Sequence, residues 1–477
     1  MDEEALNILK RIYVSESNAP SSKHRTLHKI LLSLIEEGVF PYGSKLPSTR
    51  LLASSIGVSR VTALKSYELL KNSSHISSVM GSGYSVSYSR SKFELSQKKV
   101  GFELSNRALA FERSSGILTK VPHEAAEFYP GIPPLDLFPI NTWKTLINRY
   151  WRNVKTRGLS FAPEFGLKEL QSILATHLLL SKGINCHPQQ IMIVSGNVQS
   201  IFLTTTLLIN PGDKVALQNP SMPSSIAIFK GHDARLVELF EGTDIKLCYV
   251  NGLTQYPSQK LLSKKNKKNL LKWASECNSV IIEDDLEHVL GISENAESLF
   301  ELDQDGRVIY LFSLNRILHP SIRISFMVVP EALIQPMESL ISQSHQFIPP
   351  SIQSVIKDFI QESHLSKHSK IIREVKEIRY RIFKAIWQNT IPELPFDEEY
   401  SDGLYTRVLY CGHVKKWDLQ AVQALAESRI YVQPLSTCYW GKKPAQGFVM
   451  SYTCIHESRI GHRIREIKKV LKDRGLL

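Results

Sequence analysis

Apolar residues recur with a helical period close to the start of the chain. The segment 27–38 carries them on one face and is therefore predicted to be a helix that ends near Gly38. A second short helix is predicted after Ser48, whose side chain can cap it, and Gly57 permits a tight turn before a third helix near Ser59. Two helices joined by a glycine turn predict a helix-turn-helix.

The third helix has a polar start and an apolar side. Ser59, Arg60 and Thr62 are donors at its start that can reach base edges and phosphates. We expect the apolar residues further along to pack inward, namely Val61, Leu64, Tyr67 and Leu69 or Leu70. On periodicity alone, a plain amphipathic helical hairpin with solvated arginines is an equally good interpretation.

A hairpin is predicted directly downstream of this helix. Residues 75–88 predict two short strands around a Gly-Ser-Gly tripeptide at 81–83. Such a slender tip can lie in a minor groove. The hairpin is therefore expected to act as a wing beside the helix-turn-helix.

The longer remainder of the chain has a different pattern. From about residue 126 onward, apolar runs typical of buried strands alternate with helical stretches, which predicts an α/β domain built on a parallel sheet. Between 89 and 125 the chain is polar, poorly periodic and rich in Ser and Lys, which is the composition of a linker. We therefore expect a winged helix-turn-helix domain over 20–88, a linker over 89–125 and a large domain over 126–477.

The distribution of charge along the chain indicates the class of binding partner. Hydrophobic residues make up 43% of the 477 residues and charged ones 22%, which is the balance of an ordinary protein with a substantial core. The net charge is +12, and residues 21–90 hold about half of this excess, with nine Lys or Arg against three Glu. This concentration predicts a polyanionic partner for the N-terminal domain.

The same composition argues against several other classes of protein. The chain begins with acidic and polar residues, and no run approaches the ~18 apolar residues of a membrane span. We therefore expect a cytoplasmic protein that does not enter a membrane. Six cysteines are scattered without a CxxC pair or a ligand-like spacing with His, so neither a metal site nor a disulfide framework is expected.

The motifs of the N-terminal part resemble a known family. The GntR family of bacterial regulators has a DNA-binding domain that is similar to GSKLPSTRLLASSIGVSRVTALKSYELL followed by GSGY. The resemblance implies that double-stranded operator DNA is the partner, and that Arg60 is the best candidate for reading guanine with two hydrogen bonds. The residues implied to contact DNA are Arg50, Ser59, Arg60, Thr62, Lys65 and, in the wing, Gly83.

The large domain narrows the resemblance to one subfamily. The aminotransferase-like domain of MocR-type GntR regulators has an opening that is nearly FYPGIPPLDLFPINTW, and further similar motifs span almost all of residues 126–455. The resemblance implies a type I aminotransferase-like fold that binds pyridoxal phosphate as an effector-sensing cofactor, in a protein that is usually a homodimer. We therefore expect a DNA-binding transcriptional regulator that responds to a small-molecule effector.

One residue that this cofactor requires is missing. Pyridoxal phosphate chemistry needs a lysine that forms an imine with the cofactor. By resemblance, the family's lysine falls at Arg316, ahead of Arg323, which matches the arginine that meets the phosphate. A shifted alignment recovers no lysine, because none occurs between Lys272 and Lys357. Arginine stays protonated near neutral pH and is not a competent nucleophile, so we expect neither covalent cofactor nor a catalytic residue.

Other positions of the cofactor site depart from the family in the same direction. The family's tyrosine after the Asp-Asp pair, its aromatic residue against the cofactor ring, its Tyr-Gly pair, its histidine and its substrate-binding arginine are all replaced. The residues that stand there are, in that order, Leu286, Met222, Phe161 with Ala162, Thr254 and Val449. Stacking, phosphate contacts and recognition of an amino-acid carboxylate are therefore expected to be weakened.

Part of the cofactor site remains by resemblance. Asp284 matches the partner of the pyridine nitrogen, although a carboxylate at a strand end can equally serve as a structural cap. The remnant residues are Ser195, Gly196, Asn197, Gln255, Asp284, Arg316 and Arg323. Besides a regulator that senses a ligand or dimerises, two alternatives stay open. One binds pyridoxal phosphate non-covalently, with Arg316 pairing with the phosphate; the other is an active aminotransferase, which needs a lysine that the sequence lacks.

Overall fold

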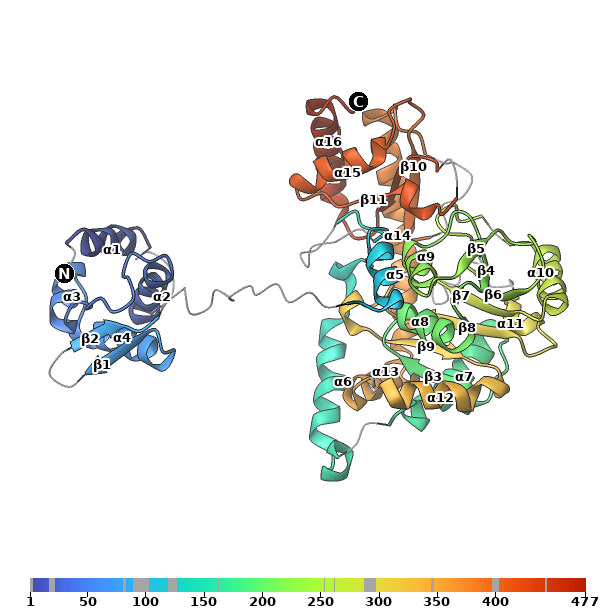
Figure 1. The fold of residues 1–477 in the computed structure, drawn as a ribbon, viewed down its shortest axis with the longest axis horizontal. Helices are drawn as coiled ribbons and strands as arrows, with labels where there is room; N and C mark the ends of the chain where they lie inside the picture. The colour runs from blue at the N-terminus through green and yellow to red at the C-terminus, as the bar shows by residue number, and fades with distance from the viewer. Residues whose placement is uncertain are drawn as a thin grey trace. The chain divides into compact units, whose positions relative to one another are not determined.

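The computed structural model divides the chain into two compact units. The first runs to Glu103 and the second begins at Leu104, and each has apolar clusters of its own (Figure 1). The residues that the structure describes are 3–16, 22–79, 83–88, 103–118, 127–160, 163–252, 254–260, 262–286, 297–344, 347–396, 403–441 and 444–477.

The first unit contains the predicted helices and hairpin. Its described elements are α1 (Glu3–Glu16), α2 (Lys23–Glu36), α3 (Thr49–Ile56), α4 (Arg60–Asn72), β1 (Ile76–Val79) and β2 (Gly83–Val86). The two strands pair antiparallel, with Ile76 opposite Val86. The predicted helix-turn-helix and hairpin are therefore confirmed.

Two serine caps set the start of α3 and of α4. Ser48 Oγ accepts the backbone N–H of Leu51 at 3.2 Å, and Ser59 Oγ accepts that of Thr62 at 3.1 Å. Between them, Gly57 ends α3 with φ at +72°, in the left-handed region that favours glycine. The local sequence thus dictates where both helices begin.

Helix α1 extends the unit beyond the predicted range of 20–88. Ala5, Leu9 and Tyr13 are buried in the same apolar cluster as Leu27. These three residues are spaced by four, so they lie on one helical face. The acidic and polar residues around them concealed this face in the sequence.

Helix α5 (Asn106–Ser115) lies inside the segment that composition predicted to be a linker, and it belongs to the second unit. Ser105 Oγ caps it by accepting the N–H of Ala108 at 3.2 Å, and Ala110 and Ser114 are buried where it packs on α9. Only two residues of this helix are buried. Its sequence therefore lacks the apolar periodicity that would have indicated a helix. The rest of the predicted linker, 89–102 and 119–125, lies outside the described residues.

The second unit is built on a seven-stranded sheet of order β3-β9-β8-β7-β6-β4-β5. Strands β4 to β8 form its parallel part. The seven strands are β3 (Ile191–Val194), β4 (Lys214–Leu217), β5 (Arg235–Val237), β6 (Ile245–Val250), β7 (Val280–Asp285), β8 (Val308–Ser313) and β9 (Ser325–Val328).

Strand β9 runs antiparallel to both of its neighbours, β3 and β8. The prediction of a parallel sheet was therefore right for the centre and wrong for this strand. The cause is the connection, because only residues 314–324 join β8 to β9. A parallel crossover needs about a dozen residues or more and usually a helix, so this chain returns antiparallel.

Helices cover both faces of the sheet. Alternate strand residues face opposite ways, so Ile193 and Phe312 lie in one apolar cluster while Met192 and Leu311 lie in another. The first face is covered by α6 (Ile140–Asn153), α7 (Lys168–Lys182), α10 (Lys264–Glu276), α11 (Leu299–Leu302) and α13 (Pro350–Gln361). The second face is covered by α8 (Asn197–Leu208), α9 (Pro223–Gly231) and α12 (Glu331–Ser344).

The C-terminal part of the second unit has its own small sheet and core. Strands β10 (Tyr405–Leu409), β12 (Gly447–Ser451) and β11 (Gln433–Pro434) pair antiparallel in that order. An apolar cluster joins them to α14 (His364–Thr390), α15 (Trp417–Glu427) and α16 (Glu457–Asp473). Trp387 and Trp417 are fully buried within it.

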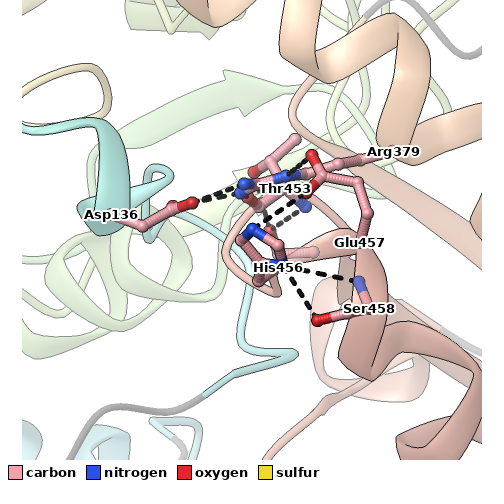
Figure 2. A network of polar contacts seen from close by, with 7 residues as sticks. Asp136, Arg379, Thr453, His456, Glu457 and Ser458 are labelled. Carbon is pink, nitrogen blue, oxygen red and sulfur yellow. Dashed lines mark hydrogen bonds and ion pairs between the residues drawn. The ribbon is translucent and has the colours of Figure 1, made fainter.

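One buried arginine joins the start of the second unit to its end (Figure 2). Arg379 of α14 is 1% exposed, and its Nη1 and Nη2 donate to both carboxylate oxygens of Asp136, at 3.1 and 2.5 Å. Its Nε donates to Glu457 at 2.8 Å, and Nη1 also donates to the carbonyl of Thr453. Burial raises the pKa of Asp136, but the hydrogen bonds and charge of Arg379 outweigh it and leave this pKa below its usual value.

Candidate functional site

Helix α4 separates a buried face from an exposed one. The buried residues are Ala63, Ser66, Tyr67 and Leu70. Val61 is 61% exposed and Leu64 is 40% exposed. The prediction that apolar residues pack inward was therefore right for Tyr67 and Leu70 and wrong for Val61 and Leu64. With 3.6 residues per turn, positions 61 and 64 share the outward face with 60 and 65.

The predicted DNA contacts of the helix-turn-helix lie at the starts of α3 and α4 and in the first turns of α4. Arg50, Arg60 and Lys65 are exposed, and within the described residues no hydrogen bond or ion pair engages their side chains. Ser59 and Thr62 stand at the first turn of α4, with their hydroxyl oxygens 2.9 Å apart. Free cationic groups and hydroxyls at the start of a recognition helix suit contacts with phosphates and base edges.

The hairpin is held against α4 by two tyrosines. The rings of Tyr84 and Tyr67 meet edge to face with centroids 4.8 Å apart, and Tyr67 Oη donates to the carbonyl of Pro47 at 2.8 Å. Gly83 opens β2 with φ at +86°, which glycine tolerates best. The other tip residues of the predicted wing, 80–82, lie outside the described residues.

A cavity of about 790 Å³ lies in the second unit, at the ends of β3, β7 and β8. Ligands of open α/β folds bind at this edge, where the strands end and the helices begin. Gln255 does not line the cavity; its amide donates to the carbonyl of Pro220 at 3.4 Å. The other remnant residues predicted from the sequence all line it, namely Ser195, Gly196, Asn197, Asp284, Arg316 and Arg323.

Asp284 is a buried carboxylate with two partners on the protein side. Asn197 Nδ2 donates to Oδ1 at 2.5 Å, and Tyr249 Oη donates to Oδ2 at 2.7 Å. Burial raises the pKa of Asp284 to about 6, while the Tyr249 and Asn197 hydrogen bonds and the charge of Arg316 act in the opposite direction. This carboxyl group therefore changes its charge near neutral pH.

The start of α8 forms another wall of the cavity. Gly196 precedes the helix with φ at +101°, and the N–H of Ser195 donates to the side-chain oxygen of Gln199. Asn197 Oδ1 is buried and has no hydrogen-bond partner within the described residues. The helix points its unpaired backbone N–H groups toward this end, which favours a negatively charged ligand group.

Two arginines follow β8 along the cavity wall. Arg316 is half-buried, and Arg323 is exposed with φ at +51°. Among the described residues, neither guanidinium takes part in a hydrogen bond or a close ion pair. The loop between them is held by Asn315, whose Oδ1 accepts the N–H of Ile324 at 3.2 Å. The cavity therefore presents two cationic groups without protein partners.

The positions that depart from the family are divided between cavity and core. Met222 and Leu286 line the cavity, whereas Thr254 and Val449 are buried and do not line it. Val449 lies in a small apolar cluster with Tyr256 and Tyr405. No lysine lines the described cavity. Phe161 and Ala162 lie outside the described residues.

Several lining residues were not identified from the sequence. Tyr129 borders the cavity, and burial raises its pKa to about 12. Helix α5 contributes Phe111, Ser114 and Ser115, and Leu118 follows just after the helix. Nothing in the local pattern of 103–118 points to a ligand, because these residues reach the cavity only through the packing of α5 on α9.

Among the described helices, none combines the length and apolar character required to cross a membrane. Within that part of the chain, no group of three His, Cys, Asp or Glu side chains is placed to hold a metal ion.

Two family models match separate parts of the chain. Residues 24–86 match the bacterial regulatory proteins of the gntR family, and residues 133–246 match aminotransferase class I and II. The first match covers the helix-turn-helix and the wing. The second covers the chain from the region of Asp136 to the beginning of β6.

Similar proteins align over nearly the whole length of the chain. The probable rhizopine catabolism regulatory protein MocR of Rhizobium meliloti is 25% identical, over 95% of this chain and 95% of its own length. The pyridoxine biosynthesis transcriptional regulator PdxR of Corynebacterium glutamicum is 24% identical, over 94% of this chain and 96% of its own. Both comparisons extend well beyond the DNA-binding domain.

Solved structures agree on the fold of the second unit. LysN, an α-aminoadipate aminotransferase of Thermus thermophilus, superimposes with a TM-score of 0.66 at 22% identity, covering 78% of this chain and 99% of that protein. Its crystals contained N-(5'-phosphopyridoxyl)-L-leucine. The similarity establishes an aminotransferase-like fold.

Proposed function

We propose that this chain, a GntR-type regulator that joins a winged helix-turn-helix to an aminotransferase-like domain as MocR-type regulators do, controls transcription by binding operator DNA in the cytoplasm. The observation that carries DNA binding is the exposed side of α4, where Arg60 lies free beside the capped first turn. The wing, held to α4 through Tyr67 and Tyr84, supplies the second contact.

The second unit acts as a sensor of a small ligand in this proposal. Arg316 supports it most directly, because its half-buried guanidinium has no close protein partner and borders a cavity large enough for a small molecule. A cation in such a position is stabilised by a ligand that brings a negative charge. Ligand binding here is non-covalent.

The residues present do not fit covalent attachment of pyridoxal phosphate. Arg316 stands where the family has its lysine, and no lysine lines the described cavity. A guanidinium is protonated near neutral pH and forms no imine. Met222 and Leu286 also bring apolar side chains where the family has aromatic groups. We therefore infer that the aminotransferase-like domain is catalytically inactive.

Non-covalent binding of pyridoxal phosphate is a second candidate for the sensing function. Asp284 favours it, because this carboxyl group lines the cavity and matches the partner of the pyridine nitrogen. The phosphate would then bind at the start of α8 and at Arg316 and Arg323. The two candidates share the same cavity and differ only in the ligand.

We also propose that the protein is a homodimer through its second unit. On this unit, Trp151 is 57% exposed and Leu159 is 61% exposed, and large apolar side chains in solvent favour association. A dimer also places two recognition helices on two half-sites of an operator. Light scattering on the full chain tests this, and a monomer at micromolar concentration would contradict it.

DNA binding is tested by replacing Arg60, the first residue of α4. In gel-shift titrations, Arg60→Ala should weaken binding to the preferred site by about 1–3 kcal/mol and relax its sequence preference. Lys71→Ala, at the other end of α4, is the matched control and should change binding less. Affinity should also fall steeply with salt. If Arg60→Ala binds every sequence as the parent does, α4 is not the recognition helix.

The inactive-domain proposal is tested with spectroscopy and turnover. The parent mixed with pyridoxal phosphate should show no imine absorbance and no label after borohydride reduction. Arg316→Lys should give at most a weak imine without measurable transamination, because losses of several cooperating groups are not repaired by restoring one. Turnover of any amino acid by the parent would overturn the proposal.

A further inference from the structure

Helix α5 gives the ligand cavity a wall that comes from the connecting segment. Phe111, Ser114 and Ser115 of α5 border the cavity, as does Leu118 just after the helix. The helix starts at Asn106, three residues after the end of the first unit. The wall therefore lies next in the chain to the segment that leads to the DNA-binding unit.

The position of α5 on the second unit depends on a close contact between Phe111 and Gly231. The ring of Phe111 lies over Gly231 at the end of α9, so closely that a Cβ at position 231 would come within 2.4 Å of two ring carbons. Two further rings surround Phe111, with centroids at 5.9 Å for Phe202 and 5.2 Å for His232. Any larger residue at 231 must displace the ring of Phe111, through which α5 packs on α9.

His232 is itself held in a single orientation. Its Nδ1 lies 2.9 Å from the carbonyl oxygen of Ile228 and therefore carries the proton, so Nε2 accepts from Thr206 Oγ1 at 3.0 Å. Burial lowers the pKa of His232, which keeps the ring neutral. His232, one of the two rings that pack against Phe111, is thus held in place, while α5 itself is short.

The cavity side of α5 offers both apolar and polar contacts. Leu118 is 46% exposed, and Phe111 is half-buried. The hydroxyls of Ser114 and Ser115 donate to carbonyl oxygens of their own helix, at 3.0 and 2.7 Å, which leaves their oxygens able to accept. A ligand with an apolar body would cover Leu118 and Phe111 and gain free energy from that burial.

We propose that α5 is part of the ligand site, and that the ligand is a small organic anion. This inference rests on the proposed sensing function. The acid group of the ligand binds Arg316 and Arg323, and its apolar body packs against Phe111 of α5 and Leu118, which follows the helix. Occupancy then holds α5 on the second unit.

Three probes separate the two halves of this site in the full-length protein. Phenyl phosphate carries an acid group and an apolar body, inorganic phosphate carries the acid group alone, and benzyl alcohol has the ring without the acid. Binding is followed by thermal shift, and the state of α5 by hydrogen exchange of residues 103–118. Phenyl phosphate should slow this exchange about tenfold, whereas inorganic phosphate should bind without slowing it and benzyl alcohol should do neither.

Two outcomes distinguish the inference from the function on which it rests. If phenyl phosphate binds in a way that needs Arg316 but leaves exchange over 103–118 unchanged, α5 is no part of the site while the sensor remains. If neither phosphate compound binds saturably, the anion site itself is wrong and the sensing function loses its main support.

A matched pair of glycine variants tests the contact between Phe111 and Gly231 and leaves Arg316 and Arg323 unchanged. Gly231→Ala should displace Phe111, speed exchange of residues 103–118 and remove the protection by phenyl phosphate, while inorganic phosphate still binds. Gly116→Ala is the control, because its φ is −65° and its Cβ would meet only a carbonyl oxygen at 4.0 Å. Equal exchange of residues 103–118 in the two variants would overturn the claim that the Phe111–Gly231 contact holds α5.

Discussion

Two arginines of the second unit, Arg379 and Arg316, differ in what surrounds them. Arg379 is almost fully buried, and its guanidinium donates to Asp136, Glu457 and the carbonyl of Thr453 (Figure 2). Arg316 is half-buried at a cavity and has no close partner within the described residues. A protein that removes a guanidinium from water normally satisfies it. The difference supports a structural role for Arg379 and the proposed role of Arg316 in binding a ligand.

The largest effect is expected where the arginine is fully paired. Arg379→Met leaves Asp136 and Glu457 without their cation and should lower the free energy of unfolding by about 3–5 kcal/mol. Urea denaturation measures the loss. Arg373→Met, at an exposed position of the same helix, is the control and should stay within about 0.5 kcal/mol of the parent. Similar losses in both variants would remove the structural role from Arg379.

Replacing Arg316 should weaken ligand binding and have little effect on the stability of the fold. Arg316→Gln should weaken phenyl phosphate binding about tenfold to a hundredfold, since a hydrogen bond to a charged group contributes about 1.5–3 kcal/mol. The free energy of unfolding should fall far less than in Arg379→Met, because Arg316 gives up only its charge beside Asp284 and no hydrogen bond to a described residue. Arg235→Gln, at an exposed position of β5, should leave both quantities unchanged. A stability loss as large as that of Arg379→Met would break the comparison.

The smallest effect is the pH dependence that Asp284 gives to the cavity. Its pKa of about 6 lies above the usual value, so the group is neutral below that pH and negative above it. Anion binding should therefore weaken as pH rises from about 5 to about 7.5, by about threefold to tenfold, because a nearby unit charge contributes on the order of 1 kcal/mol. Benzenesulfonate is the suitable probe, since its own charge is constant over this range.

The control for this titration is Asp284→Asn, which keeps a polar side chain and removes the ionisable group. Its binding of benzenesulfonate should be independent of pH over the same range. A parent protein whose affinity stays flat, or rises with pH, would show that Asp284 does not change charge beside the bound anion.

Much of the candidate site was accessible from the sequence, because its residues sit at strand ends and helix starts. The remnant residues other than Gln255 do meet at one cavity. Gln255 is not among the residues that line this cavity, and its amide donates to the carbonyl of Pro220. On α4, the outward positions of Val61 and Leu64 were missed, since a local apolar pattern does not say which face a neighbouring helix covers.

The sequence by itself determined features that depend on neighbouring residues. Serine caps and a glycine turn specify the helix-turn-helix, and the absence of lysine between 272 and 357 follows from residue identity alone. The tertiary structure decided what joins distant segments. It set the antiparallel direction of β9, the three partners of Arg379 and the place of α5 at the cavity. Periodicity reports only which side of an element is apolar, whereas its partner depends on packing across the whole chain.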